Sequence, residues 1–306
     1  MHALVVGAGP LGRSATAHLV ADDHRVTLVT RSATSLPGAR PLAADVTSAD
    51  LPARLPDDIE AVVACCNFPY GRWDRYWPSA IRNLIAAAER SGAVLVLAGN
   101  LYAYAPPTRP MRETDPQTST TINGRVRALV WSEAMTAHEA GRVRVVEVRG
   151  SDYVGPGAGA NSHATRVVPA VLGGGTARPL GDPEQPHTWT AVDDFGRLLA
   201  RATRDEAMWG RAWHVPSAPA VSMREYCNAL RATAGLPGPA RVSALPGWVV
   251  RSAGLVSADL RSVGQQLYQF ERPFVMDDSD ARTMLGESHT DFDQTLAAVV
   301  AQADRR

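Results

Sequence analysis

The sequence predicts an α/β protein: a doubly wound parallel sheet accompanied by a smaller C-terminal lobe. Short apolar runs alternate with helical patterns through the first half of the 306-residue chain. Most of these runs are continuously apolar, as expected of parallel strands that are buried on both faces. After residue 153 the alternation ends and Gly/Pro-rich connections such as "VGPGAGAN" and "LGGGTARPLGDPEQP" follow, which indicates a second, smaller lobe.

The expected elements follow in order. Strands are predicted over residues 3–9, 25–30, 40–46, 60–66, 93–99 and 143–150. Helical patterns are found between them over residues 9–22, 73–92 and 123–141. The last two end in Gly92 and Gly141, which are suited to stop a helix. Repeated strand–helix–strand units predict the doubly wound sheet.

Domain boundaries follow from the same pattern. We expect a first domain over residues 1–152, to which residues 190–215 return, and a lobe formed by residues 153–189 and 216–306. Ligands of open α/β sheets bind at the carboxyl ends of the strands, so the lobe would close over that crevice and bind the substrate.

The amino-acid composition limits the classes of partner that we expect. The formal net charge is zero, which argues against nucleic acid and membrane surfaces as partners. No run approaches the ~18 apolar residues of a membrane span, and the N-terminus does not resemble a signal peptide, so we expect a cytoplasmic protein with a small-molecule substrate. The three cysteines show no metal spacing, and adjacent Cys65 and Cys66 are interpreted as core residues rather than a redox pair. All 31 basic residues are arginine, which excludes any chemistry that needs a lysine.

A glycine-rich turn follows the first strand. In "VVGAGPLGR" the spacing Gly7-x-Gly9-x-x-Gly12 opens a helix, as in dinucleotide-binding turns. The helix N-terminus offers free N–H groups to phosphates, and a proline in the first turn sacrifices no helical hydrogen bond. The alternative is a tight turn without a ligand. The turn residues predicted to bind the cofactor are Gly7, Gly9, Pro10, Leu11 and Gly12.

The second strand ends without the acidic residue that binds a ribose 2′-hydroxyl in NAD-binding proteins. Arg31 and Ser32 stand there instead, and an arginine can pair with a 2′-phosphate, so NADP(H) is favoured over NAD(H). A solvated loop charge is the alternative for Arg31. Asp45 and Val46 close the third strand, where they could flank the adenine; Asp45 could equally be a turn or cap residue.

With these features the chain resembles the extended short-chain dehydrogenase/reductase family, in its NAD-dependent epimerase/dehydratase branch. The resemblance rests on the glycine-rich turn and on "CCNFPYGRW", "GNLYAYAPP", "VRGSDYVGPG", "TAVDDFGRLLA" and "LYQFERPFVMDDSDARTMLG". It implies a Rossmann domain that binds NAD(P) and a C-terminal lobe that selects the substrate. Because many relatives pair, it also implies a homodimer.

The same resemblance implies a missing catalytic dyad. Family members carry a Ser or Thr after the fifth strand and a Tyr-x-x-x-Lys on the next helix. The matching positions here are Asn100, Asn123 and Arg127. Asparagine could polarise a carbonyl but cannot titrate, and arginine can replace the cation but is a poor proton shuttle. The standard proton source is therefore absent, and the hypothesis for its replacement is Tyr102; alternatively, Tyr102 and Tyr104 only wall the pocket.

Further pocket residues are expected at the strand ends and in the lobe. Those near the cofactor are Asn67, Ser151 and Tyr153; those near the substrate are Phe68, Tyr70, Asn161, His163, His187 and Trp189. Trp73, Tyr76 and Trp77 could line a pocket or pack between helices. A pair of His163 with Asp152 is a minor hypothesis for acid–base chemistry. Asp193 and Asp194 are expected to cap a helix.

The function predicted is an NADP(H)-dependent oxidoreductase or epimerase-like enzyme with a non-standard site, acting on a small metabolite or natural-product intermediate. Two alternatives stay open: a redox-inactive NADP-binding sensor or scaffold, and the same fold used for non-redox isomerisation, cyclisation or dehydration. An enzyme needs a cavity of several hundred Å³ beside the nicotinamide.

Overall fold

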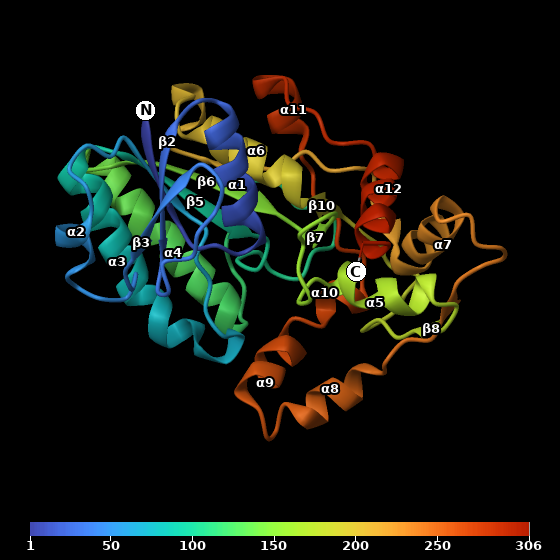
Figure 1. Cartoon of the computed structure of the whole chain (residues 1–306). Coiled ribbons are helices and arrows are strands. Elements are labelled where there is room, and N and C mark those ends of the chain that lie inside the picture. The colour runs from blue at the N-terminus through green and yellow to red at the C-terminus, as the bar shows by residue number, and fades with distance from the viewer. Residues whose placement is uncertain (306) are drawn as a thin grey trace. The chain divides into compact units, whose positions relative to one another are not determined.

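The computed structural model describes residues 1–305 and divides into two compact units. The first unit comprises Met1–Ala103, Gln117–Arg149 and Phe195–Trp213. The second comprises Tyr104–Pro116, Gly150–Asp194 and the chain from His214 onward. Figure 1 labels the α-helices and several of the strands.

The first unit is built on a seven-stranded sheet with the order β11-β6-β5-β4-β1-β2-β3. Its strands are β1 (His2–Val6), β2 (Arg25–Thr30), β3 (Ala39–Ala43), β4 (Ala61–Ala64), β5 (Val94–Asn100), β6 (Arg144–Gly150) and β11 (Ala212–His214). The β1–β2, β1–β4, β2–β3 and β4–β5 pairs are parallel. The predicted doubly wound α/β fold is thereby confirmed, and the strand order reverses at β1, where such sheets bind ligands.

Helices follow the strands as the periodicity predicts. They are α1 (Pro10–Ala21), α2 (Leu51–Arg54), the 3-10 turn η1 (Tyr70–Arg72), α3 (Trp73–Ser91), α4 (Ile122–Glu139), α6 (Val192–Ala202) and the 3-10 turn η2 (Glu206–Met208). Gly92 ends α3 with a φ of 67°, and Gly141 follows α4 with a φ of 69°. Both glycines adopt the left-handed conformation that stops a helix without steric cost.

Three predicted strands are too long at their carboxyl ends. β1 ends at Val6 rather than residue 9, because Gly7 turns the chain with a φ of 105°. β3 ends at Ala43, and β4 ends at Ala64 rather than residue 66. Continuously apolar sequence therefore runs past the sheet, and the residues beyond each strand end become available to line a site.

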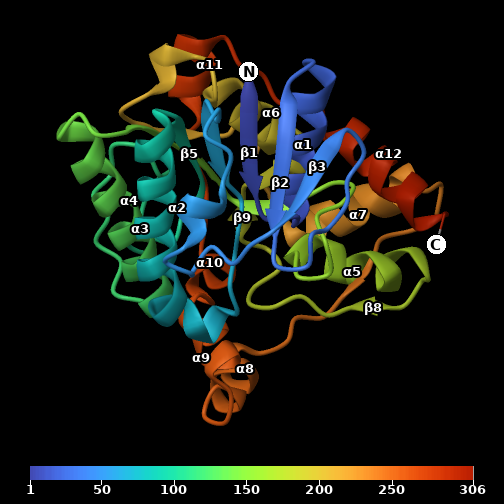
Figure 2. The ribbon, with the colours of Figure 1, turned by 60° about the vertical axis from the view of Figure 1, so that its left-hand side comes forward.

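The second unit contains three short two-stranded ladders and a helical core. β7 (Asp152–Val154) pairs with β10 (Trp189–Ala191), β9 (Pro186–His187) with β12 (Val221–Ser222), and β8 (Thr176–Ala177) with β13 (Arg241–Val242). The helices are α5 (His163–Leu172), α7 (Met223–Thr233), α8 (Gly247–Ala253), α9 (Ala258–Gln265), α10 (Tyr268–Glu271), α11 (Ser279–Leu285) and α12 (Phe292–Ala303). Figure 2 shows α5, α7 and α12 grouped together, and their apolar faces form one buried cluster.

Helix α6 corrects one capping prediction. It begins at Val192, so Asp193 and Asp194 lie inside its first turn rather than before it. The carboxylate of Asp194 accepts hydrogen bonds from the backbone N–H and the hydroxyl of Thr290, at 2.7 and 2.8 Å. Asp194 therefore fixes the segment that leads into α12.

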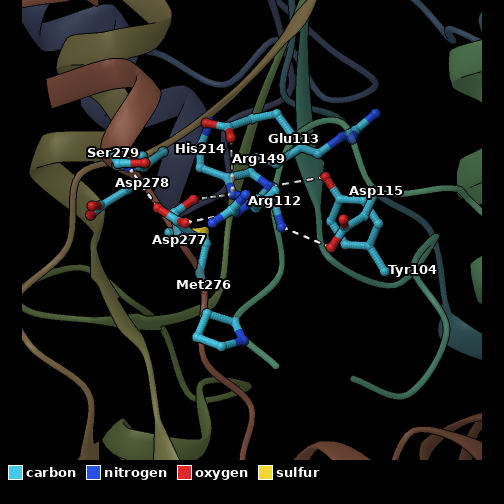
Figure 3. A network of polar contacts seen from close by, with 12 residues as sticks. Tyr104, Arg112, Glu113, Asp115, Arg149, His214, Met276, Asp277, Asp278 and Ser279 are labelled. Atoms are coloured by element: carbon cyan, nitrogen blue, oxygen red, sulfur yellow. Dashed lines mark hydrogen bonds and ion pairs between the residues drawn. The ribbon is translucent and has the colours of Figure 1, made fainter. Parts of the chain in front are cut away.

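The excursion Tyr104–Pro116 belongs to the second unit, where a polar network holds it (Figure 3). The Tyr104 hydroxyl donates to Nε2 of His214 at 2.9 Å, and Nδ1 of His214 donates to the carbonyl of Asp277 at 2.7 Å. Glu113 accepts the backbone N–H of His214 at 3.0 Å, while Arg112 pairs with the Asp277 carboxylate at 3.1 Å. Tyr104 is 2% exposed, so it serves packing rather than the wall of a pocket.

None of the helices within residues 1–305 is both long and apolar enough to span a membrane.

Candidate cofactor and active site

The glycine-rich turn has the backbone geometry that a phosphate-binding loop requires. A Cβ on Gly7 would lie 2.8 Å from the Cys65 carbonyl oxygen, and a Cβ on Gly12 would lie 1.9 Å from that of Gly7. Apart from Gly9 itself and its two chain neighbours, no residue has a heavy atom within 4 Å of the Cβ position of Gly9, which precedes α1. Gly7 and Gly12 therefore permit close packing of strand and helix, whereas Gly9 faces open space where another molecule can approach. Pro10 occupies the first turn of the helix, as predicted.

A cavity of about 660 Å³ opens beside this turn, within the first unit. It is lined by residues at and beyond the carboxyl ends of β1, β2, β3 and β4: Val6, Gly7, Ala8, Gly9, Val29, Thr30, Arg31, Ser32, Thr34, Ala44, Asp45, Val46, Thr47, Cys65, Cys66, Asn67, Phe68, Pro69, Arg72 and Tyr76. The cavity brings together the predicted residues Gly7, Gly9, Arg31, Ser32, Asp45, Val46, Asn67 and Phe68. Pro10, Leu11 and Gly12, the first residues of α1, are absent from its lining.

The segment after β2 forms a polar rim. Thr30 Oγ1 accepts the backbone N–H of Thr34 at 2.8 Å, and the hydroxyls of Ser32 and Thr34 lie 3.3 Å apart. Arg31 is exposed and makes no hydrogen bond or ion pair with the residues that the structure describes. The rim thus presents a guanidinium and two hydroxyls, the groups that bind a phosphate monoester.

Asp45 is both a turn residue and part of the cavity wall. Its carboxylate accepts hydrogen bonds from the backbone N–H and the hydroxyl of Thr47, at 2.9 and 2.7 Å. These bonds, and to a lesser degree the charge of Arg31, hold the pKa of Asp45 below its ordinary value. A charged carboxylate therefore lies in the same cavity as Arg31.

Several lining residues were not predicted to bind the cofactor. Cys65 and Cys66 are half-buried at the cavity wall rather than inside β4, and burial raises the pKa of the Cys66 thiol to about 12. Arg72 and Tyr76 belong to η1 and α3. Their positions depend on how the loop after β4 folds, which the local sequence pattern does not encode.

Asn123 and Arg127, which the resemblance matches to the family's Tyr and Lys positions, lie on α4. Asn123 is 1% exposed, and both polar atoms of its amide are buried without a hydrogen-bond partner among residues 1–305. Arg127 lies one turn further along. Its guanidinium stands over the rings of Trp73 and Trp77, at 4.8 and 4.5 Å from their centroids.

Arg127 also donates to the carbonyl of Ala98 at 3.3 Å. Its cation is therefore held by two indoles and a strand carbonyl, and cation–π contacts of this kind are stabilising when they are desolvated. Trp73 and Trp77 are both 1% exposed, so they pack between helices rather than line a pocket.

Tyr102 forms a phenol pair with Tyr70. Their hydroxyl oxygens are 2.9 Å apart, and the Tyr102 ring stacks on Trp73 at a centroid distance of 5.9 Å. The Asn100 side chain accepts the backbone N–H of Tyr102 at 3.1 Å, which fixes the start of this loop. Either hydroxyl can donate the hydrogen bond that joins the two oxygens, because a phenol both donates and accepts.

In the second unit Asp152 pairs with His187, not with His163. The Asp152 carboxylate lies 2.9 Å from Nε2 of His187, whose Nδ1 donates to the Gln269 carbonyl at 3.1 Å. His163 instead stacks on Phe270 at 4.1 Å. The predicted pairing is wrong because β9 brings His187 to the carboxylate while α5 directs His163 into an aromatic stack.

The predicted residue Trp189 lies in the same aromatic cluster, with its ring centroid 4.3 Å from that of His187 and 6.2 Å from that of His163. The Trp189 indole is buried and donates to the Val221 carbonyl at 3.0 Å, so it contributes to the core. The Ser151 backbone N–H donates to the Thr190 hydroxyl at 2.9 Å, while Tyr153 pairs with Thr190 across the β7–β10 ladder. Asn161 is exposed.

The fold and the turn together define a dinucleotide-binding protein of the Rossmann type. A model of the NAD dependent epimerase/dehydratase family matches residues 3–213, and the chain belongs to this family.

Solved structures show the same fold over the whole chain. MoeE5 in complex with UDP-glucose and NAD is 21% identical with a TM-score of 0.80, covering 100% of this chain and 99% of that one. DesIV, a dTDP-glucose 4,6-dehydratase from Streptomyces venezuelae with NAD and TYD bound, is 18% identical with a TM-score of 0.78, covering 100% and 98%. UDP-N-acetylglucosamine 4-epimerase from Bacillus cereus is 17% identical with a TM-score of 0.78, covering 99% and 96%. A search of the curated proteins gave no match.

Proposed function

We propose that this protein is an NADP(H)-dependent oxidoreductase or epimerase-like enzyme whose catalytic site departs from the family pattern. The observation that carries the proposal is the 660 Å³ cavity that joins the glycine-rich turn to the Arg31 rim. Gly9 and the N-terminus of α1 would bind the pyrophosphate, and Arg31 with Ser32 and Thr34 would bind the 2′-phosphate. Bound in this way, the dinucleotide supplies or accepts a hydride.

The residues of α4 would act on the substrate by polarisation rather than by proton transfer. A buried amide without partners, as in Asn123, is costly unless a ligand completes its hydrogen bonds. We infer that Asn123 and Asn100 orient a carbonyl or similar group, and that Arg127 provides a fixed positive charge nearby.

The proton would come from Tyr102. Its hydroxyl pairs with that of Tyr70, so removal of a proton from one phenol leaves an oxygen that the other phenol can stabilise. Turnover of an identified substrate, measured over a range of pH, tests this role. Tyr102→Phe should lose turnover at all pH values, and full retention of turnover would exclude Tyr102 as the proton donor.

The substrate class that we propose is a small polar metabolite or natural-product intermediate. Nucleotide sugars are the first compounds to screen, because solved neighbours were obtained with UDP-glucose or UDP-glucuronic acid. The Asp152–His187 pair already satisfies both side chains, so we assign it to the structure of the second unit.

One observation favours a second candidate, a redox-inactive NADP-binding sensor. Arg127 is held between Trp73 and Trp77, so the residue at the lysine position of the dyad serves helix packing. Hydride transfer to any carbonyl, imine or enone substrate would reject the sensor, whereas tight NADPH binding without turnover on a broad panel would favour it.

The cofactor assignment is tested by fluorescence titration of the purified protein with NADPH and NADH. We expect NADPH to bind more tightly, and Arg31→Ala to weaken NADPH about tenfold or more while leaving NADH unchanged, since a charge-assisted hydrogen bond contributes about 1.5–3 kcal/mol. Arg40→Ala is the matched control, because Arg40 is an exposed arginine of β3 outside the cavity. Failure of both nucleotides to bind would exclude the proposed function.

A further inference from the structure

We propose that Arg72 is a second determinant of NADP(H) selectivity, acting with Arg31 on the adenosine 2′-phosphate. This inference rests on the proposed function. Arg72 ends the 3-10 turn η1 and precedes α3, and it lines the same cavity as Arg31.

The two arginines belong to segments that follow strands on either side of β1. Arg31 follows β2 and Arg72 lies in the connection after β4, and these strands flank β1 in the sheet. Two strand spacings separate β2 from β4, about 10 Å. Both arginines line the cavity in which the 2′-phosphate is proposed to bind, so that phosphate would meet a lining that carries two cations.

Arg72 has no competing partner. Its backbone N–H donates to the Pro69 carbonyl at 2.9 Å, but its exposed guanidinium forms no ion pair, hydrogen bond or ring contact with the residues that the structure describes. Its neighbour Arg75 differs, because the Arg75 guanidinium lies over the Tyr76 ring at 5.6 Å. The Arg72 cation is thus available to a ligand, whereas the Arg75 cation is already engaged by an aromatic ring of the cavity wall.

The net charge of the cavity lining depends on Arg72. Among the residues that line the cavity, Asp45 is the only carboxylate, and Arg31 and Arg72 are the only arginines. Asp45 opposes any phosphate, so with Arg31 alone the formal charges of the lining cancel. Arg72 makes the lining positive. A 2′-phosphate carries a charge of about −1.5 to −2 near neutral pH, so it benefits from this second cation, while an uncharged 2′-hydroxyl does not.

The test compares NADPH and NADH titrations of the wild type, Arg72→Ala, Arg31→Ala, the double variant and Arg75→Ala. We expect Arg72→Ala to raise the Kd for NADPH about tenfold at low salt and to change the Kd for NADH less than twofold. Arg75→Ala should leave both values unchanged. The double variant should bind the two nucleotides equally, and thermal unfolding should confirm that each variant is folded.

Three results would overturn the inference. An equal loss for both nucleotides would show that Arg72 binds the pyrophosphate, which NADPH and NADH share. No change for either would show that Arg72 is only a solvated charge. A wild type that binds NADH as tightly as NADPH would remove the selectivity that Arg72 is proposed to support. The proposed function fails at a different point, when the wild type binds neither nucleotide.

Discussion

We predict that His163 makes the second unit less stable in acid. Its imidazole stacks on Phe270 at 4.1 Å, and burial lowers its pKa from 6.5 to about 4, an effect that the charge of Asp152 partly opposes. The unfolded chain therefore binds a proton on this residue at a higher pH than the folded protein does. Stability rises with pH wherever the unfolded state binds more protons, so this contribution is complete above 6.5 and is lost as the pH falls from 6.5 towards 4.

The size of the effect follows from the shift. Each pKa unit corresponds to about 1.4 kcal/mol, so the full loss is about 3 kcal/mol, of which about 2 kcal/mol falls between pH 7 and pH 5. Urea unfolding at pH 7, 6 and 5 should show the midpoint of the wild type falling more steeply than that of His163→Phe, at unchanged m-value. Phenylalanine retains the stack and removes the titration.

A constant stability difference between the two proteins over this range would refute the reasoning. The second measurement is an NMR titration of the His163 ring in the wild type, which does not depend on the variant folding. A midpoint close to 6.5 would contradict the effect of burial directly.

Two further predictions concern the first unit. Gly12→Ala should lower the free energy of unfolding by about 1–3 kcal/mol, because the new Cβ would lie 1.9 Å from the Gly7 carbonyl oxygen. Gly9→Ala should have the stability of the wild type and lose only nucleotide affinity. Equal melting temperatures for the two variants would contradict this prediction. Asn123→Leu should be neutral or stabilising by up to about 2 kcal/mol, since it replaces two unpartnered buried polar atoms, while abolishing any turnover. Marked destabilisation in thermal unfolding would show that the Asn123 amide is satisfied in the free protein.

The sequence predicts the sheet well because its evidence is local. Continuous apolar runs and glycine stops depend on residues that are near one another in the chain, and they correspond to β1, β4, β5 and α3 as observed. The glycine-rich turn is predictable for the same reason, since Gly7, Gly9 and Gly12 act within one turn.

The candidate site is less predictable because it depends on contacts between distant residues. Arg127 is positioned by Trp73 and Trp77, which lie on another helix, and no local pattern reveals that contact. Asp152 pairs with His187, 35 residues away, although His163 is closer in the chain. The positions of the strand ends predict which segments meet. Which side chains of those segments come into contact depends on tertiary packing.

The division of the chain also constrains how the protein can be made. The chain passes between the units at residues 103/104, 116/117, 149/150, 194/195 and 213/214. The edge strand β11 of the first sheet is therefore synthesised after the second unit's segments Tyr104–Pro116 and Gly150–Asp194 and before its long segment from His214 onward. A nascent chain stopped near residue 150 exposes the unpaired edge of β6, and open strand edges invite aggregation. Because each unit is assembled from several separate segments of the chain, neither can be produced alone by a single cut in the gene.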